Sequence, residues 1–517
     1  MEPFVYFLPS TLSYSKVQEH LSRDRQYQLL FEQGEMCEGA LLDTFDNGLF
    51  HAAQLLFLLD GQLLLLDLQG GQILEQSISP GRMVIGEMKK GPVVEMLLEV
   101  STLRALLPLA QVRVRREEGR LLDDEGKTLV RLYHITIGRG RRKLLGMGCV
   151  HYLRGYAEAY TDLQHGLEAC GAKACQNGAD LYSGLALKER SYSVKPEIPL
   201  LPETSVKESA VAILRTFLNV ARQNEEHIIA DSDSEFLHDY RVSLRKVRSV
   251  VSLCKGVFDA RESLRLKEKL AEIMRYTNGL RDLDVYLLNR AEYLRLVPPA
   301  AHGGLYRLFD ILLQKRKGEQ KKLSGVMQGK GYSLGMEHLE KMFAASDGLK
   351  DGPEAGMQSL IFAKKQIMKR YRKVCKSGRA LDETTPDEPI HQLRINCKKL
   401  RYLMEFFTPL FPSAKIKLLI RSLKLLQDNL GDFNDYSVQQ QYLGKMQAQE
   451  GVGGEKALSL SYSIGALTAM LYQLQKEERG RIMANLAAFD SLEIREAFNE
   501  LFFIEEGTDE DHRLLQQ

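Results

Sequence analysis

The sequence lacks the patterns that are typical of metal fingers, disulfide frameworks and membrane segments. Its seven cysteines are scattered without a CxxC pair, and we expect them to remain reduced thiols. The most apolar stretch, Leu55 to Leu66, is interrupted by Asp60 and Gly61, and the first residues lack a basic region followed by a long apolar run. We therefore predict no signal peptide, no membrane span and a cytoplasmic location.

Neither positive nor negative charge predominates overall, because the formal net charge of the 517 residues is only +2. This sum conceals a local excess: between Ala355 and Leu381 there are eight Lys or Arg residues and no acidic residue. We interpret this segment as a surface that faces an anion such as phosphate, with a solvated helix face as the alternative. The length and the hydrophobic content of 44% predict more than one globular domain.

Residues 1–193 alternate short apolar runs with turn signals, which predicts a mainly β domain of the α+β class. A hairpin is expected to turn at Asp124, Glu125 and Gly126. The expected strands include residues 3–8, 63–66, 93–100 and 112–115, and the expected helices are 155–170 and 176–186.

Three prolines, Pro196, Pro199 and Pro202, then fall within seven residues, and they predict an extended linker at 194–203. The apolar spacing beyond it is helical, so we predict an all-α domain over 204–505 and an acidic tail at 506–517. The expected helical segments are 206–229, 235–257, 261–278, 282–296, 304–328, 356–377, 391–408, 413–430, 434–449, 455–477 and 480–503. Breaks are expected at Pro298 and Pro299, at Pro386 and Pro389, and at 451–454.

One pattern occurs twice in this helical region. His238 is followed by cations at positions 241, 245, 246 and 248, and His391 is followed by cations at 394, 398, 399 and 401, an offset of 153 residues. The offset is the same where Arg281-Asp282 is matched by Asn434-Asp435, and we expect both of these segments to be turns. The interval predicts two copies of one helical unit, over about 204–345 and 356–505.

The spacing within each copy predicts an amphipathic helix. At about 100° per residue, His238, Arg241, Arg245 and Arg248 share one stripe, Lys246 lies at its far edge, and the opposite side is apolar. Like charges three or four residues apart repel one another unless an anion neutralises them. A mixed row of Arg forks and Lys point charges suits a phosphate chain better than a single carboxylate. Two alternatives stay open: a solvated face, and histidines that hold their helices against the Asp282 or Asp435 turn.

At these residues the sequence resembles the conserved-histidine α-helical domain family, CHAD. The resemblance is carried by HxxRVxxRKxR at 238–248, HxxRIxxKKLRYxxEFF at 391–407, GLRDLDV at 279–285 and LGDFNDYSV at 430–438. It implies two pseudo-symmetric four-helix bundles whose basic surfaces meet at a groove or pore that binds inorganic polyphosphate, with no cofactor. The implied ligand-facing residues are His238, Arg241, Arg245, Lys246, Arg248, His391, Arg394, Lys398, Lys399 and Arg401. The cation-rich segment offers Lys365, Lys369, Arg372 and Lys373 as additional basic contacts.

Residues 1–193 resemble a degenerate CYTH domain, the triphosphate-tunnel fold. The resemblance is carried by Leu41 to Asp46, by Ala110 to Arg116 with the following hairpin, and by Leu153 to Tyr156. The metal-binding ExExK motif of that family has no counterpart in the first strand, Pro3 to Leu8. Glu95 and Glu99 would lie on one side of an expected strand, and we interpret them as a solvent face. Without paired carboxylates we expect no metal site and no catalysis here.

Three functions follow from these observations. The first is non-enzymatic binding of inorganic polyphosphate, with association with polyphosphate granules as a consequence. The second is a metal-dependent triphosphatase or phosphohydrolase activity in the N-terminal domain. The third is nucleic-acid binding by the basic face, which is less favoured because Tyr402 is not accompanied by a ladder of aromatic residues. No membrane partner is expected.

Overall fold

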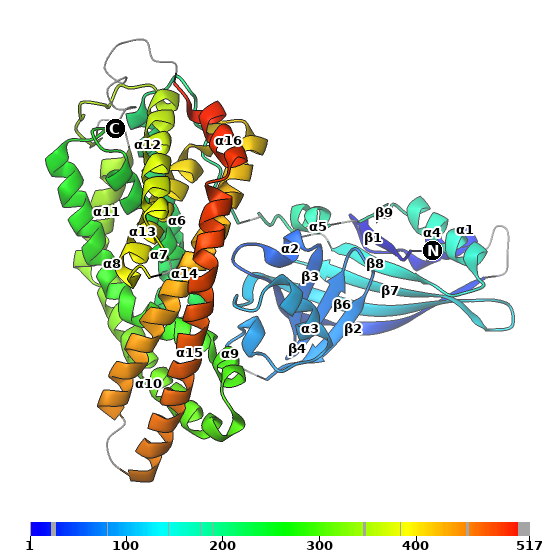
Figure 1. Cartoon of the computed structure of the whole chain (residues 1–517). Coiled ribbons are helices and arrows are strands. Elements are labelled where there is room, and N and C mark those ends of the chain that lie inside the picture. The colour runs from blue at the N-terminus through cyan, green and yellow to red at the C-terminus, as the bar shows by residue number, and fades with distance from the viewer. Residues whose placement is uncertain are drawn as a thin grey trace. The chain divides into compact units, whose positions relative to one another are not determined.

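The computed structural model describes residues 2–21, 27–79, 81–142, 144–175, 177–188, 190–344, 348–382, 384–450 and 454–504 (Figure 1). It divides into one compact unit of Met1–Ser193 with Ser232–Glu235 and a second of Val194–Asp231 with Phe236–Gln517. The predicted order, a sheet-rich region followed by an all-helical region, is confirmed. The predicted acidic tail lies outside the described residues. All seven cysteines are unpaired. In the described ranges, every helix is too short or too polar to cross a bilayer.

The N-terminal unit is built on a nine-stranded antiparallel sheet with the order β5-β4-β3-β2-β6-β7-β8-β1-β9. The predicted hairpin joins β6 to β7, and Gly126 supplies the φ of +77° in its turn. The strands are β1 (Phe4–Leu8), β2 (Gln28–Asp43), β3 (Gln54–Leu59), β4 (Gln62–Asp67), β5 (Ile73–Ser77), β6 (Leu107–Leu122), β7 (Thr128–Gly138), β8 (Leu145–Tyr152) and β9 (Lys173–Ala174).

This sheet curls until strands from its two ends are in contact. Gly71, in the turn between β4 and β5, packs so closely on the other end that an added Cβ would lie 2.7 Å from both Pro3 and Cys149. Helices cover the convex side (Figure 1). They are α1 (Tyr14–Leu21) and α4 (Ala157–Ala169) at one end, and η1 (Ile85–Glu87) and α3 (Pro92–Val100) at the other, while α2 (Gly48–His51) and α5 (Ala179–Gly184) complete the unit.

The strand predicted at 93–100 is wrong, because these residues form α3. Pro92 occupies the first turn, where its missing N–H is tolerated, and Val93, Val94 and Leu97 then recur with helical spacing on the buried side. Glu95 and Glu99 are exposed on the opposite side of this helix. The interpretation of these two acids as a solvent face therefore holds, although the element was misassigned.

The second unit consists of helices that repeat with the predicted interval. The first residues of α12, α13 and α14 follow those of α6, α7 and α8 by 153 residues each. The first copy comprises α6 (Val206–Ile229), α7 (Ser234–Leu253), α8 (Ala260–Leu288), α9 (Arg290–Leu296), η2 (Pro299–Ala301), α10 (His302–Met327) and α11 (Lys330–Ala344). The second comprises α12 (Ser359–Arg379), α13 (Asp387–Phe407), η4 (Thr408–Leu410), α14 (Ser413–Glu450), α15 (Gly454–Phe489) and α16 (Leu492–Phe502).

A pseudo-two-fold axis relates the two copies, as backbone hydrogen bonds at the starts of α6 and α12 show. Val206 N donates to Met357 O at 2.8 Å, and Ser359 N donates to Thr204 O at 2.9 Å. Ser359 is the counterpart of Val206 in the second copy, and Met357 is the counterpart of Thr204, each 153 residues later. The two bonds are therefore symmetry equivalents of each other, as expected for a contact across a two-fold axis. A second pair of bonds has the same relation, Lys207 N to Ala355 O and Leu360 N to Pro202 O.

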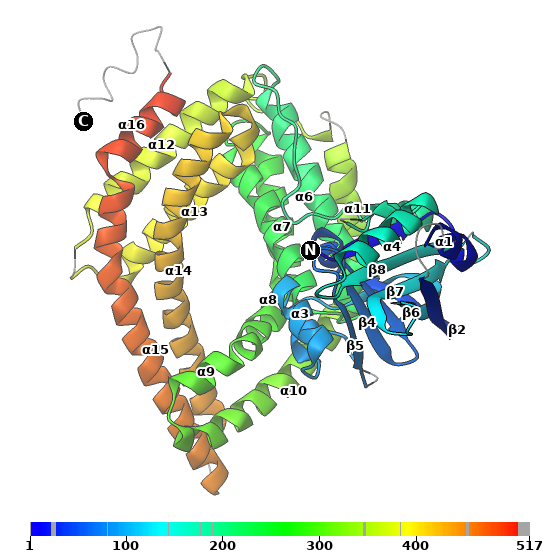
Figure 2. The same ribbon diagram turned by 90° about the vertical axis from the view of Figure 1, so that its right-hand side faces the viewer.

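The two copies run along opposite sides of the helical unit and meet at both ends (Figure 2). At the end away from α6 and α12, a hydrophobic cluster joins α8, α9 and α10 to α14 and α15. Here the ring of Tyr286 stacks on that of Tyr442, with 4.6 Å between the ring centroids. The Tyr286 hydroxyl also donates to the carbonyl of Gln439 at 3.4 Å, and Gln439 is the residue equivalent to Tyr286 in the second copy. The predicted pair of pseudo-symmetric helical bundles is therefore present.

Several predicted helix boundaries are wrong. The expected turns at Arg281-Asp282 and Asn434-Asp435 are helical, because α8 and α14 continue through them. Gly279 precedes the first of these segments, but glycine inside a helix costs only about 1 kcal/mol, and packing of Leu280 and its neighbours outweighs that. The break expected near residues 478–479 likewise falls inside α15.

Two further boundary errors come from proline and glycine. Helix α13 begins at Asp387 rather than at His391, with Pro389 in its first turn, where a backbone N–H would have no intrahelical acceptor, so no helical hydrogen bond is lost. Helix α11 was not predicted, because its two glycines interrupt the pattern. Its buried residues, Met336, Leu339 and Phe343, nevertheless keep helical spacing.

Candidate polyanion-binding face

The two motif helices, α7 and α13, have the predicted apolar backs. On α7, Tyr240, Leu244 and Val247 are fully buried. The equivalent residues of α13 are Leu393, Cys397 and Leu400, and they are fully buried as well. Because these backs fix the rotation of both helices, the cation-bearing fronts are turned away from the core of each repeat.

Arg241 and Arg394 are counterparts, and each is anchored by the next helix of its own repeat. Arg241 Nη1 donates to Thr277 on α8 and, at 2.8 Å, to Asn278 Oδ1, while Arg394 Nη2 pairs with Asp435 of α14 at 3.2 Å. Burial and the neighbouring charge of Arg245 lower the pKa of Arg241 to about 10. Both guanidinium groups are thus held in place, and that of Arg241 lies in positively charged surroundings.

Arg245 and Lys398 are also counterparts, and their charges act on each other across the pseudo-two-fold axis. The pKa of Lys398 is lowered to about 8 by burial and by the positive charges of Arg394, Arg245 and Arg401, which outweigh the opposing charge of Asp435. Arg245 belongs to the first repeat, whereas the other four residues belong to the second. The axis therefore brings the two predicted stripes together. We call Arg241, Arg245, Arg394 and Lys398 the cross-repeat face.

Arg401 lies beside this face, and Tyr402 follows it in the chain. The Nε of Arg401 is 3.2 Å from Glu405, so this guanidinium is partly neutralised within its own helix. The ring of Tyr402 stacks on Phe406 at 5.9 Å. An aromatic side chain that already stacks within the protein is a poor platform for a base.

The histidines differ from the cations in what they contact. His391 Nδ1 lies 2.6 Å from Asn434 Oδ1, so it ties α13 to α14. This is the alternative role considered for the histidines, with Asn434 in a helix as the partner instead of Asp435 in a turn. His238 is half-buried on α7, and the position equivalent to Asn434 in its repeat is Arg281.

Lys246 and Lys399 are counterparts whose surroundings have diverged. Lys246 is only 8% exposed, and its ammonium lies 4.3 Å from the ring centroid of Phe217. The residue equivalent to Phe217 in the second repeat is Arg370, and it lies near Lys399. Burial and the charges of Arg370, Lys373 and Lys255 lower the pKa of Lys399. Lys246 is therefore turned into the protein, and Lys399 belongs to an uncompensated group of cations.

The remaining predicted cations lie near the edges of these groups. Arg248 is exposed, and its charge, with that of Lys255, lowers the pKa of Lys267 below its usual range, burial being the largest cause. On α12, all four additional contacts that were predicted are exposed, namely Lys365, Lys369, Arg372 and Lys373. Lys373 is near Lys399.

Sequence reasoning missed several cations of this region. Arg370 lies inside the segment that was recognised as cation-rich, and the offset to Phe217 would have identified it as a difference between the repeats. Arg281 was recognised only as part of an expected turn, although its charge contributes to the lowered pKa of Arg241. Lys255 and Lys267 carry no pattern, because they join the cluster only through the packing of the two repeats.

The N-terminal unit has a different interior. Many residues on the concave side of its curled sheet form one hydrophobic cluster, and Arg116 of β6 pairs on this side with Glu75 of β5 at 2.9 Å. From the strands the cluster includes Val5, Phe7, Leu41, Leu55, Phe57, Leu64, Leu66, Val112, Val114, Ile135, Ile137 and Met147. These apolar side chains offer no donors or charges for a triphosphate, and the Arg116 guanidinium is already paired with Glu75.

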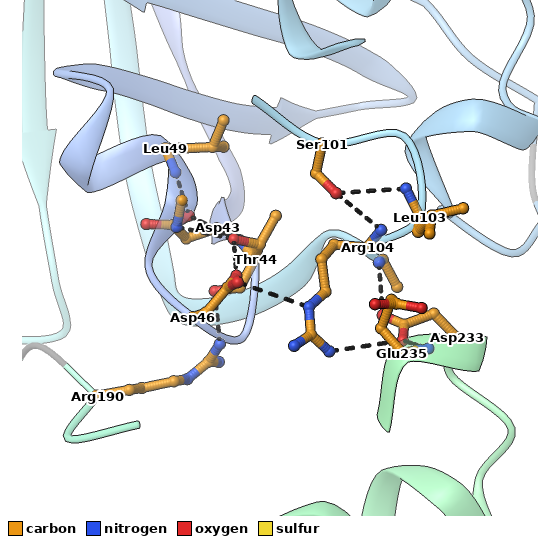
Figure 3. A network of polar contacts seen from close by, with 12 residues as sticks. Asp43, Thr44, Asp46, Leu49, Ser101, Leu103, Arg104, Arg190, Asp233 and Glu235 are labelled. Carbon is orange, nitrogen blue, oxygen red and sulfur yellow. Dashed lines mark hydrogen bonds and ion pairs between the residues drawn. The ribbon is translucent and has the colours of Figure 1, made fainter. Parts of the chain in front are cut away.

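Residues that carry the CYTH resemblance have structural partners in this unit (Figure 3). The buried Asp43 carboxylate accepts the N–H groups of Thr44 and Leu49 at 2.7 and 2.8 Å. Asp46 lies 3.6 Å from Arg104, which in turn lies 3.7 Å from Asp233. Among the described residues, no group of three or more His, Cys, Asp or Glu side chains is placed to hold a metal ion.

The helical unit thus contains two copies of a helical repeat whose cationic faces meet at a pseudo-two-fold axis. Comparison with known families agrees with this description: the family model for the CHAD domain matches residues 212–444. The chain therefore contains a CHAD domain. The match includes both motif helices.

Individual relatives are distant. The uncharacterized proteins MT2285 and Rv2226, from two strains of Mycobacterium tuberculosis, are each 22% identical over 257 residues, 49% of this chain and 48% of the relative. The chain thus spans about half the length of these curated relatives. The CHAD domain from the plant Ricinus communis has a TM-score of 0.49 and 22% identity, over 58% of this chain and 97% of that one. PptA from Streptomyces chartreusis has a TM-score of 0.42 and 15% identity, over 57% and 100%.

Proposed function

We propose that this protein binds inorganic polyphosphate through the cross-repeat face, without chemical turnover. The observation that carries the proposal is the position of Arg245 and Lys398. They are counterparts in the two repeats, yet their charges act on each other in a partly buried region. Like charges brought together in this way raise the free energy of the unliganded fold, and a bound polyanion removes that repulsion.

The arrangement favours a chain of phosphates over a single small anion. Arg241 and Arg394 extend the positive region along α7 and α13, and their anchored guanidinium groups present planar donors for phosphate oxygens. Lys398 adds a mobile point charge at the centre. The resemblance to the CHAD family supports the same ligand class.

The two alternative functions make different predictions. A triphosphatase in the N-terminal unit would release phosphate from tripolyphosphate with Mg²⁺ or Mn²⁺. The apolar interior of the curled sheet argues against this activity, and measurable release would revive it. Nucleic-acid binding by the cross-repeat face is disfavoured because Tyr402 is stacked on Phe406. Equal displacement of polyphosphate by single-stranded RNA, at matched phosphate concentration, would favour it.

A pull-down with immobilised long-chain polyphosphate tests the proposal. We expect the wild-type protein to be retained and the double variant Arg245→Ala/Lys398→Ala to be largely lost from the beads. The matched control is Lys317→Ala/Lys321→Ala, which removes the same charge from an exposed side of α10 and should be retained like the wild type. Equal retention of both variants would contradict the proposal.

The cellular setting follows from this activity. We propose that the protein acts in the cytoplasm and concentrates on polyphosphate granules, because a long polymer offers many binding sites. A fluorescent fusion should colocalise with the granules, and it should become diffuse when Arg245 and Lys398 are replaced by Ala.

A further inference from the structure

Helix α12 carries a row of cations that is separate from the cross-repeat face. At about 100° per residue, four of its exposed cations fall within an arc of about 60°, and they extend over about 16 Å of helix. Buried Ile367, Tyr371 and Val374 occupy the opposite side. The row consists of Lys365, Lys369, Arg372 and Lys376, which we call the α12 stripe.

Among the residues that the structure describes, none neutralises the α12 stripe. In the described part of the chain, none of its four cations forms an ion pair or a hydrogen bond. Other helices of the same unit pair surface cations with acids three residues away, as in Lys269 with Glu272, Lys322 with Glu319, and Arg481 with Glu478. Helix α12 contains no acidic residue. Like charges at i,i+4 destabilise an isolated helix by a few tenths of a kcal/mol per pair, so this row lacks the compensation found elsewhere.

The stripe leads toward the meeting point of the two repeats. Lys373 lies at its edge, one residue from Arg372, and is near Lys399 on α13. Arg370 and Lys255 are also near Lys399, and Lys255 belongs to the first repeat. A series of cations thus extends from the solvent side of α12 to the junction with the first repeat.

The chemistry of α12 selects a soluble polyanion over a membrane surface. The large apolar side chain that α12 exposes is Ile361, in its first turn, and the stripe itself has no apolar flank to insert among lipids. The surface therefore offers charge and hydrogen-bond donors without an apolar contact.

We propose that the α12 stripe, continued by Lys373, Arg370, Lys399 and Lys255, is a second binding surface for the same polyphosphate chain. This inference rests on the proposed function. A long chain occupies both surfaces at once, whereas a short oligophosphate occupies only one. The protein thereby discriminates between polyphosphates by chain length.

The length dependence follows from linkage of the two contacts. Once one part of a chain is bound at the cross-repeat face, binding of a second part becomes intramolecular, and such linkage raises overall affinity by about 10²- to 10⁴-fold. Additional phosphate contacts also displace more counterions, so the affinity for long chains should fall more steeply with salt. Tripolyphosphate should show neither effect.

The test compares two ligands and three proteins by fluorescence anisotropy or calorimetry. The ligands are tripolyphosphate and a long-chain polyphosphate, and the proteins are the wild type, a stripe variant and a control. The stripe variant is Lys365→Gln/Lys369→Gln/Arg372→Gln/Lys376→Gln. The control is Lys317→Gln/Lys321→Gln/Lys330→Gln/Lys341→Gln, at exposed positions of α10 and α11. Unchanged thermal unfolding midpoints verify that each variant is folded.

We expect the stripe variant to bind tripolyphosphate like the wild type and to bind the long chain at least tenfold more weakly, with a shallower salt dependence. The control should match the wild type for both ligands. Wild-type affinity of the stripe variant for the long chain, or an equal loss in the control, would overturn the second surface and leave the proposed function intact. Failure of the wild type to bind either ligand would overturn both. With single-stranded RNA added as a further ligand in the same assay, a stripe variant that loses only RNA binding would overturn the second polyphosphate surface and assign it to nucleic acid.

Discussion

Replacement of Lys398 by Arg should remove a pH dependence from polyphosphate binding. In the free protein the pKa of Lys398 is lowered to about 8 by burial and by the positive charges of Arg394, Arg245 and Arg401, with Asp435 opposing them. A bound polyanion favours the charged ammonium and raises this pKa again. Binding therefore takes up a proton, and affinity falls as the pH rises through about 8.

The size of the effect follows from this pKa. The ammonium form makes up about nine-tenths of Lys398 at pH 7 and about one-tenth at pH 9, which corresponds to a tenfold loss of affinity, or about 1.4 kcal/mol. Solvent screening at this partly exposed site makes that value an upper limit. Arginine stays charged over the whole range, and Arg245 shows that the equivalent position accommodates it.

Calorimetry in buffers of different ionisation enthalpy measures both affinity and proton uptake. Between pH 7 and pH 9 the wild type should lose affinity several-fold and take up a fraction of a proton. Lys398→Arg should bind with nearly constant affinity and without that uptake. The ligand should be a long-chain polyphosphate, so that titration of its terminal phosphate groups contributes little to the measured proton uptake. The same pH profile in both proteins would refute the assignment of the effect to Lys398.

Three further variants test the stability of the fold through urea denaturation. Lys398→Met should raise the free energy of unfolding at pH 7 by on the order of 1 kcal/mol, because it removes a partly screened charge from like-charged neighbours; an unchanged value would mean that the repulsion is absent. His391→Ala should lower it by about 1 kcal/mol through loss of the bond to Asn434, with little effect on polyphosphate affinity; a large loss of affinity would instead make this histidine a ligand contact. Asp284→Ala should lower it by about 3 kcal/mol, because Asp284 pairs at 2.6 Å with the buried Arg316; a loss below 1 kcal/mol would contradict this role.

The repeated architecture could be predicted from the sequence because it is encoded in local patterns. The offset of 153 residues between the two motifs reappears as the offset between helix starts, and the apolar spacing of α7 and α13 correctly identified their buried backs. The N-terminal hairpin was predicted because Gly126 allows the positive φ of its turn. These features depend on neighbours in the chain or on simple periodicity.

Features that depend on tertiary packing were not predictable in the same way. Glycine and aspartate in the 279–285 and 430–438 segments suggested turns, yet packing against neighbouring helices keeps α8 and α14 continuous. The proximity of Arg245 to Lys398 requires the pseudo-two-fold axis, which no local pattern specifies. Lys246 was grouped with the cationic front, whereas the ring of Phe217 on another helix holds it inside the protein.

The central claim is that the two repeats present one polyanion-binding face across their pseudo-two-fold axis. The most direct test is the equilibrium affinity for long-chain polyphosphate, measured over a range of salt concentrations, for the wild type and for the variant in which Arg241, Arg245, Arg394 and Lys398 are all replaced by Ala. We predict strong, steeply salt-dependent binding by the wild type and a loss of at least a hundredfold in the variant, with a shallower salt slope. Wild-type affinity and slope in the folded variant would contradict the claim.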